Sequence, residues 1–156
     1  MCAFLGDKMD EYYMSMAIIE AEKCLKTGDV PVGAIIVDES GNIIAKAHNT
    51  KEKDAVTIKH AEINAIVKAN KKIKNWHLDN CTMYVTLEPC MMCTGAIIDS
   101  RLKKLVYGCS SLKYGFINTK YKISSNNQGK RITIVNNVCS KECKKIIQNF
   151  FKTKRS

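Results

Sequence analysis

Residues 82–93 have the sequence Thr-Met-Tyr-Val-Thr-Leu-Glu-Pro-Cys-Met-Met-Cys, in which a strand-type segment leads directly into a helix start. The apolar and β-branched residues predict a strand over 82–87. Pro89 predicts the first turn of a helix that ends near Asp99, because proline lacks the N–H that a helix start leaves unbonded. A second strand is expected over 104–107, ended by Gly108. The stretch therefore predicts a strand–helix–strand unit of an α/β protein.

The segments on either side extend this pattern into a layered fold. Apolar periodicity and turn residues predict their secondary structure. The expected elements are a helix over 10–27, strands over 32–37 and 43–47 joined by a turn, a polar irregular segment over 51–59, a helix over 61–69, a strand over 132–135, and a last helix over 141–152 with Ser140 as its N-cap. Residues 109–130 show no clear pattern. The order predicts one domain over 1–156 with a mixed sheet and a basic tail at about 152–156.

Composition places the chain among globular proteins that have a strong positive charge. Its 156 residues are 46% hydrophobic and 26% charged, which excludes disordered, collagen-like and mucin-like chains. No apolar run approaches the ~20 residues that cross a bilayer, so no membrane partner is expected. The 25 basic and 15 acidic residues give a net charge of +10. That charge indicates either a polyanionic partner or only the lysine bias of an AT-rich genome.

The eight cysteines are too sparse for a disulfide scaffold. Residues 1–14 lack the apolar segment of a secretory signal, so we expect reduced thiols or metal ligands inside a cell. The expected location is the cytoplasm, or also the nucleus if the cell is eukaryotic.

Two short motifs carry the candidate chemistry. His60-Ala61-Glu62 opens one predicted helix, and Pro89-Cys90-Met91-Met92-Cys93 opens the next. A Cys-x-x-Cys pair alone also occurs as a redox pair or as half of a structural zinc site. A structural site needs two further ligands, and Cys139 with Cys143 lie far downstream at a different spacing. The combination of His-x-Glu with Pro-Cys-x-x-Cys instead matches the zinc-dependent nucleobase deaminases, in which a glutamate moves protons and is not a ligand.

Further blocks narrow the resemblance. They are Val30-Pro31-Val32-Gly33-Ala34, His48-Asn49, Thr86-Leu87-Glu88-Pro89-Cys90-Met91-Met92-Cys93-Thr94-Gly95-Ala96 and Val106-Tyr107-Gly108. From about Asp10 to Phe151 the chain resembles the tRNA-specific adenosine deaminases, which convert the wobble adenosine of an anticodon to inosine. The resemblance implies a cytidine deaminase-like fold with three layers, α/β/α, around a central mixed five-stranded sheet.

The resemblance also implies roles for individual residues. One zinc ion per chain would be held by His60, Cys90 and Cys93, and Glu62 would be the catalytic proton shuttle. The implied substrate-binding residues are Asn49, which would hydrogen-bond the flipped adenine, and Val30, Pro31, Val32 and Ala61. The implied contacts to the tRNA anticodon stem-loop are Lys113, Phe150, Phe151, Lys152 and Arg155. For Phe150 and Phe151, an equally supported alternative to RNA contact is that their rings pack the last helix onto the sheet.

Two departures from the bacterial pattern bear on the oligomer and the RNA-loop contacts. Cys109-Ser110-Ser111 stands where bacterial members usually carry an Arg-Asp pair. Further on, Phe116-Ile117-Asn118 follows Gly115, where bacterial members carry the small residues Gly-Ser. Tyr107-Gly108-Cys109 and Lys113-Tyr114-Gly115 look more like the catalytic subunit of the eukaryotic two-subunit enzyme. We therefore expect either a homodimer or a heterodimer with a related deaminase-like subunit.

Two alternative functions stay open from the sequence. A deaminase of a free nucleobase or nucleoside, such as guanine or cytosine, would share every zinc residue. A non-catalytic zinc- and RNA-binding partner subunit would share the ligands but lose the proton-shuttle glutamate. The presence of Glu62 argues against this second alternative.

Overall fold

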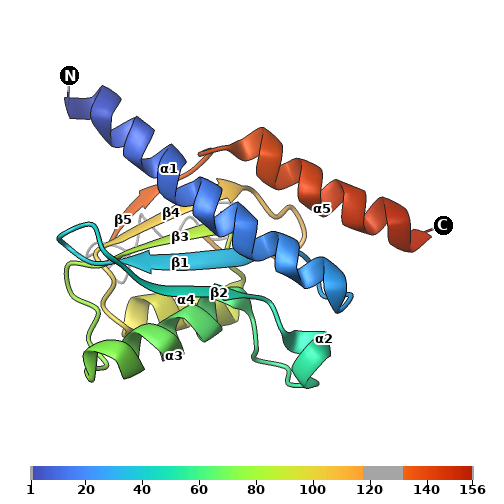
Figure 1. Ribbon diagram of the computed structural model, residues 1–156, viewed down its shortest axis with the longest axis horizontal. Helices are drawn as coiled ribbons and strands as arrows, with labels where there is room; N and C mark the ends of the chain where they lie inside the picture. The colour runs from blue at the N-terminus through green and yellow to red at the C-terminus, as the bar shows by residue number, and fades with distance from the viewer. Residues whose placement is uncertain (1, 118–131, 156) are drawn as a thin grey trace.

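The computed structural model describes residues 2–117 and 132–155 and has a mixed five-stranded sheet at its centre (Figure 1). The strand order is β2-β1-β3-β4-β5. β1 is antiparallel to β2 and β3, whereas β3, β4 and β5 are mutually parallel neighbours. The strands are β1 (Gly33–Val37), β2 (Ile43–His48), β3 (Thr82–Leu87), β4 (Lys104–Cys109) and β5 (Thr133–Val135). This confirms the predicted fold class.

Helices cover both faces of the sheet (Figure 1). One face packs on α1 (Cys2–Glu22) and α5 (Ser140–Arg155), and the other packs on α3 (Ala61–Ile73) and α4 (Met91–Asp99). The short elements are η1 (Lys23–Lys26) and α2 (Lys51–Asp54). No helix in the described part of the chain is long and apolar enough to cross a membrane.

Alternate residues of the central strands fill two separate apolar cores. In β1, Ala34 and Ile36 join the core under α3 and α4, whereas Ile35 and Val37 join the core under α1 and α5. β3 and β4 divide in the same way. A strand that is buried on both faces has an unbroken apolar sequence, which is why 32–37 was recognisable as a strand without any polar alternation.

The structure corrects several predicted boundaries. The 51–59 segment contains a helical turn, α3 extends past 69 to Ile73, and α5 continues to Arg155, so the predicted tail is helical up to that residue. α1 begins far upstream of residue 10. β4 does not end before Gly108 but continues to Cys109. The prediction for 109–130 falls partly outside the described residues.

The helical turn at 51–54 was missed because its stabilising acceptor is remote in sequence. Thr50 occupies the N-cap position but its side chain makes no capping hydrogen bond. The carboxylate of Asp29 instead accepts the backbone N–H groups of Glu52 at 2.5 Å and Lys53 at 3.3 Å. An N-terminal turn exposes such N–H donors, and an anion there stabilises it. A local sequence pattern cannot show a cap that comes from another segment.

Gly33 and Gly108 allow the helices of one layer to approach the sheet closely. A Cβ on Gly33 would overlap the carbonyl oxygen of Ala17 in α1, and a Cβ on Gly108 would overlap the Cys143 sulfur in α5. Gly108 therefore lies inside a strand as a packing residue rather than as a strand end.

We expect Gly33→Ala to destabilise the protein, since the obstructing atoms belong to the helix backbone and cannot rotate away. Overpacking of this kind costs about 1–3 kcal/mol, measurable as a lower thermal unfolding midpoint. Gly95→Ala is the matched control, because a Cβ there meets nothing within 4 Å and alanine favours a helix interior. Equal midpoints for Gly33→Ala and the wild type would contradict the close approach of α1.

Candidate metal centre and active site

His60 lies at the N-cap of α3, with an extended backbone. The loop before it is held by a hydrogen bond from the Thr50 N–H to the Lys59 carbonyl at 3.0 Å. The Asn64 amide, one turn into the helix, donates to the His48 carbonyl at 2.9 Å and to the Thr50 hydroxyl at 3.1 Å. These bonds tie the start of α3 to the end of β2 and so set the position of the imidazole.

Cys90 occupies the N-cap of α4, and Cys93 lies in the first turn of that helix. The two sulfur atoms lie 3.7 Å and 3.5 Å from His60 Nδ1, and all three candidate ligand atoms lie within 4.8 Å of one another. Tetrahedral zinc, with Zn–N near 2.05 Å and Zn–S near 2.3 Å, would separate N and S by about 3.6 Å. The donor set and its spacing therefore fit a Cys₂His metal site.

Hydrogen bonding within this group prepares one thiolate. The Cys93 thiol donates to Cys90 and holds the pKa of Cys90 at about 4, whereas the same bond raises the pKa of Cys93. The hydrogen bond to Cys90 also raises the pKa of His60. A thiolate is the form that binds metal, and the helix N-terminus around it favours that form.

Glu62 lies in the first turn of α3, two residues from His60, and is only 4% exposed. Burial is the largest influence and raises the pKa of its carboxyl to about 7. A carboxyl with a pKa near neutrality can both accept and release a proton at physiological pH. The geometry thus places an acid–base group beside the candidate metal ligands.

The predicted substrate-binding residues come together at the same end of the sheet. The Asn49 amide donates to the Val30 carbonyl at 3.1 Å, and its Oδ1 accepts the Lys51 N–H at 3.0 Å. Val30 is half-buried, while Pro31, Val32 and Ala61 are buried. This end also carries the metal group, since the start of β1 lies beside the end of β3 that leads to Cys90.

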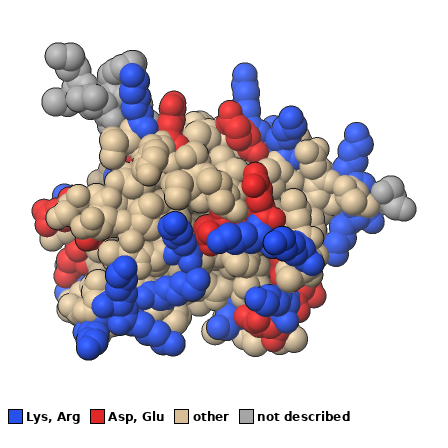
Figure 2. Space-filling view, in the orientation of Figure 1, with Lys and Arg blue, Asp and Glu red and all other residues tan. Residues whose placement is uncertain are grey.

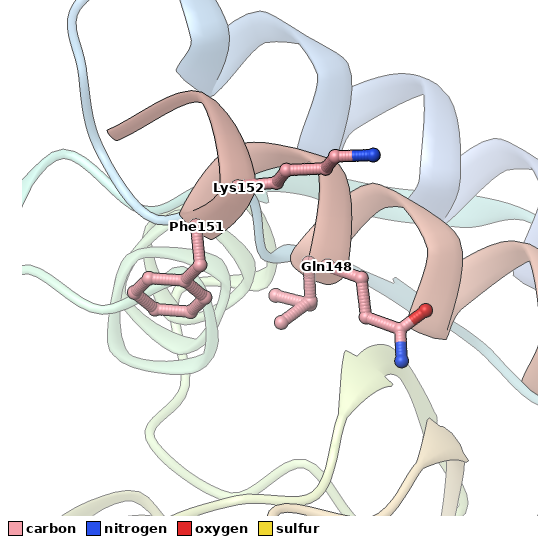
Figure 3. A pocket seen from close by; sticks show the side chains of 4 residues that line it. Gln148, Phe151 and Lys152 are labelled. Atoms are coloured by element: carbon pink, nitrogen blue, oxygen red, sulfur yellow. The ribbon is translucent and has the colours of Figure 1, made fainter. Parts of the chain in front are cut away.

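The predicted RNA-contact residues separate into buried and exposed ones. Phe150 is buried, at 9% exposed, whereas Phe151 is 43% exposed. Phe151, Lys152, Ile147 and Gln148 line a pocket of about 470 Å³ along α5, with Phe151 and Gln148 extending from the same side of the helix (Figure 3). Lys113 is exposed, with its ammonium 5.2 Å from the Tyr114 ring centroid. The Arg155 side chain lies outside the described residues.

Two buried carboxylates near the site were missed as functional candidates. Glu88 is 3% exposed, accepts the Ser111 N–H at 3.1 Å, and so fixes the loop after β4 against the residue before Pro89. Asp29 is fully buried. Glu88 could have been singled out because it sits within the Leu-Glu-Pro-Cys block, whereas Asp29 is marked by no local pattern.

The structural-zinc alternative finds no support in the described residues. Within 2–117 and 132–155, His60, Cys90 and Cys93 are the one group of three or more potential ligands that converge. Cys139 and Cys143 do not join it. Three ligands leave a tetrahedral ion one position for water or substrate, which is typical of catalytic rather than structural sites.

Comparison with known proteins identifies close relatives over nearly the whole chain. Residues 8–155 match the MafB19-like deaminase family. The tRNA-specific adenosine deaminase of Bacillus subtilis is 40% identical over 147 residues, which cover 94% of this chain and 91% of that protein. A solved tRNA:A34 deaminase, studied for A-to-I editing at the wobble position of transfer RNA, superimposes with a TM-score of 0.81 at 29% identity, covering 86% of this chain and 98% of that one.

A guanine deaminase from Nitrosomonas europaea also superimposes, with a TM-score of 0.77 at 21% identity over 90% of this chain and 83% of that one. At that identity the likeness shows a shared fold and does not bear on the substrate.

We expect Cys90→Ala and Cys93→Ala each to lose bound metal, because two remaining ligands hold an ion poorly and the ion also joins two helix starts. Elemental analysis of the purified variants measures this directly. Cys81→Ala is the matched control, because it removes a buried thiol that is not part of the ligand group. A full equivalent of metal in either ligand variant would refute the assignment.

Proposed function

This chain belongs to the tRNA-specific adenosine deaminase family, and we propose on that premise that it converts the wobble adenosine of a tRNA anticodon to inosine. The observation that carries the proposal is the meeting of His60, Cys90 and Cys93 at two helix starts, with the buried carboxyl of Glu62 beside them. The reaction consumes one water and releases ammonia from C6 of the purine.

His60, Cys90 and Cys93 are proposed to hold one zinc ion per chain. The two thiolates balance the charge of the ion. Bound there, zinc would act as a Lewis acid and lower the pKa of a coordinated water toward ~7. The distances around His60 Nδ1 match that ion without rearrangement of the helix starts.

Glu62 performs the proton transfers. Its carboxylate accepts one proton from the attacking water and passes it to the purine ring nitrogen. It then takes the second proton of that water from the new C6 hydroxyl and delivers it to the departing amine, which leaves as ammonia. Burial raises the pKa of this carboxyl, which makes the carboxylate a stronger base than an exposed glutamate. A carboxyl with the usual pKa would be a weaker base and a poorer match to this cycle.

Asn49 and the Val30–Val32 segment are proposed to hold the flipped base. The Asn49 side chain already makes one bond as donor and one as acceptor within the protein. An amide has a second N–H and a second lone pair, and these can pair with the purine. The two internal bonds fix the orientation of the amide before the base arrives.

The surface charge supports an RNA substrate. Lysines gather over the C-terminal half of α3 and near the end of α5, at the lower left and the right of Figure 2. α5 extends beyond the sheet on the side where α2 lies (Figure 1), which supports the proposed contacts of Phe151 and Lys152 to the anticodon stem-loop. We further propose that the protein acts in the cytoplasm as a dimer with a second deaminase-like chain.

Glu62→Gln is expected to keep fold and metal but to lose at least ~10²–10⁴-fold in turnover, the usual contribution of one proton-transfer group. The amide is nearly isosteric but cannot carry the proton. The assay follows inosine formation in an anticodon stem-loop, with Glu142→Gln as the control because its side chain is exposed in α5. Near wild-type turnover in Glu62→Gln would exclude Glu62 as the shuttle.

The double variant Lys152→Gln, Lys154→Gln tests the RNA substrate. Loss of two phosphate contacts should flatten the slope of log affinity against log salt by roughly 1.4–1.8, while turnover at saturating RNA changes little. The control is Lys46→Gln, Lys103→Gln, which removes the same charge from exposed side chains outside α3 and α5. Salt-independent activity of the wild type, with faster turnover of free guanine or cytosine, would instead favour a free-base deaminase.

A further inference from the structure

Asp29 is a carboxylate with no exposed surface, located between η1 and β1. Its oxygens accept the Thr27 hydroxyl at 2.6 Å and the backbone N–H groups of Glu52 and Lys53. A buried charge is tolerated only when such donors replace its hydration. The Asp29 carboxylate is therefore committed to the first turn of α2, a segment 23 residues downstream.

Asn49 makes the reciprocal connection between the same two segments. Its amide donates to the Val30 carbonyl, and its backbone N–H donates to the Val32 carbonyl at 3.0 Å. The Asp29 side chain thus bonds from segment 29–32 to segment 49–53, and Asn49 bonds in the opposite direction, from segment 49–53 to segment 29–32. We call this pair of connections between 29–32 and 49–53 the clasp.

The orientation of the Asn49 amide depends on both halves of the clasp. Its Oδ1 accepts the N–H of Lys51, and the next two N–H groups along the chain are those held by Asp29. Releasing Asp29 frees the turn that carries the Lys51 N–H, and so removes the constraint on Oδ1. The clasp lies at the metal end of the sheet, where β1 starts and β3 ends.

We infer that Asp29 is a positioning residue that acts through Asn49: its carboxylate holds the 49–53 segment against Val30–Val32 so that the Asn49 amide faces the purine in the reactive orientation. The inference rests on the proposed role of Asn49 in base binding. The hydrogen-bond partners of Asp29 in the described part of the chain are Thr27, Glu52 and Lys53, and none of these is a candidate metal ligand.

The test is a double-mutant cycle on kcat/KM with an adenosine anticodon stem-loop, using Asp29→Ala, Asn49→Ala and the double variant. Misplacement of a binding group by about 1 Å costs up to about 100-fold, so Asp29→Ala should lose roughly 10–100-fold. If Asp29 acts through Asn49, the double variant is no worse than Asn49→Ala alone. Independent roles would instead multiply the two losses, and that result would overturn the inference.

Three further measurements separate positioning from general damage. Metal content should stay at the wild-type level, and the Kd for the stem-loop should stay within about 2-fold, since phosphate contacts dominate RNA affinity. Asp29→Asn keeps one acceptor for a backbone N–H, so its kcat/KM should lie between those of the wild type and Asp29→Ala. If Asp29→Ala does not fold, Asp29→Asn replaces it in the double-mutant cycle. A wild-type kcat/KM in both single variants, Asp29→Asn and Asp29→Ala, would overturn the inference.

Asp38→Asn is the matched control. Asp38 likewise accepts two backbone N–H groups, those of Ser40 and Asn42 at 2.9 Å, but in the β1–β2 turn at the opposite end of the sheet. It should leave kcat/KM unchanged. If the wild type deaminates only a free base, the proposed function fails, and the same cycle on that base still tests whether Asp29 acts through Asn49.

Discussion

The N-termini of two helices, α3 and α4, meet at one end of the sheet, and the rest of the structure depends on that contact. His60 and Cys90 are both N-cap residues, and their ligand atoms lie 3.7 Å apart. Two helix starts bring two partial positive charges together, which is unfavourable unless negative charge lies between them. The Cys90 thiolate supplies that charge, and it is also the form of cysteine that binds a metal ion.

Three buried carboxylates, Asp29, Glu62 and Glu88, lie toward this end of the sheet, and their partners give them different roles. Asp29 and Glu88 accept backbone N–H groups and hold loops in place. Burial raises the pKa of the Glu62 carboxyl to about 7, which suits this group to proton exchange near neutral pH. Residues of the same chemical type thus become two structural anchors and one acid–base group, and the difference lies in what each carboxylate touches.

Chemistry and RNA recognition place different demands on a small domain. The reacting groups lie at the metal end of the sheet, where the ligand atoms occupy a space of a few ångströms. A tRNA anticodon arm is far larger, and phosphate contacts distribute over a surface. In the proposed function, the basic side chains near the end of α5 and along α3 would provide that surface without entering the metal centre (Figure 2). Affinity and turnover can therefore be altered separately by substitutions in the two regions.

The sequence by itself determined the elements whose signals are local. The strand at 82–87 and the helix ending at Asp99 follow from apolar runs and a helix start, and the structure has both. Motif spacing also singled out His60, Cys90 and Cys93, whose side chains converge. Tertiary structure alone decided the features that depend on remote partners. The turn at 51–54 forms because Asp29 caps it from another segment, Gly108 stays within a strand because α5 packs on it, and Phe150 rather than Phe151 is buried. Hydrogen bonds and van der Waals contacts between residues far apart in the chain leave no periodic trace in the local sequence, so these features appear only once the chain has folded.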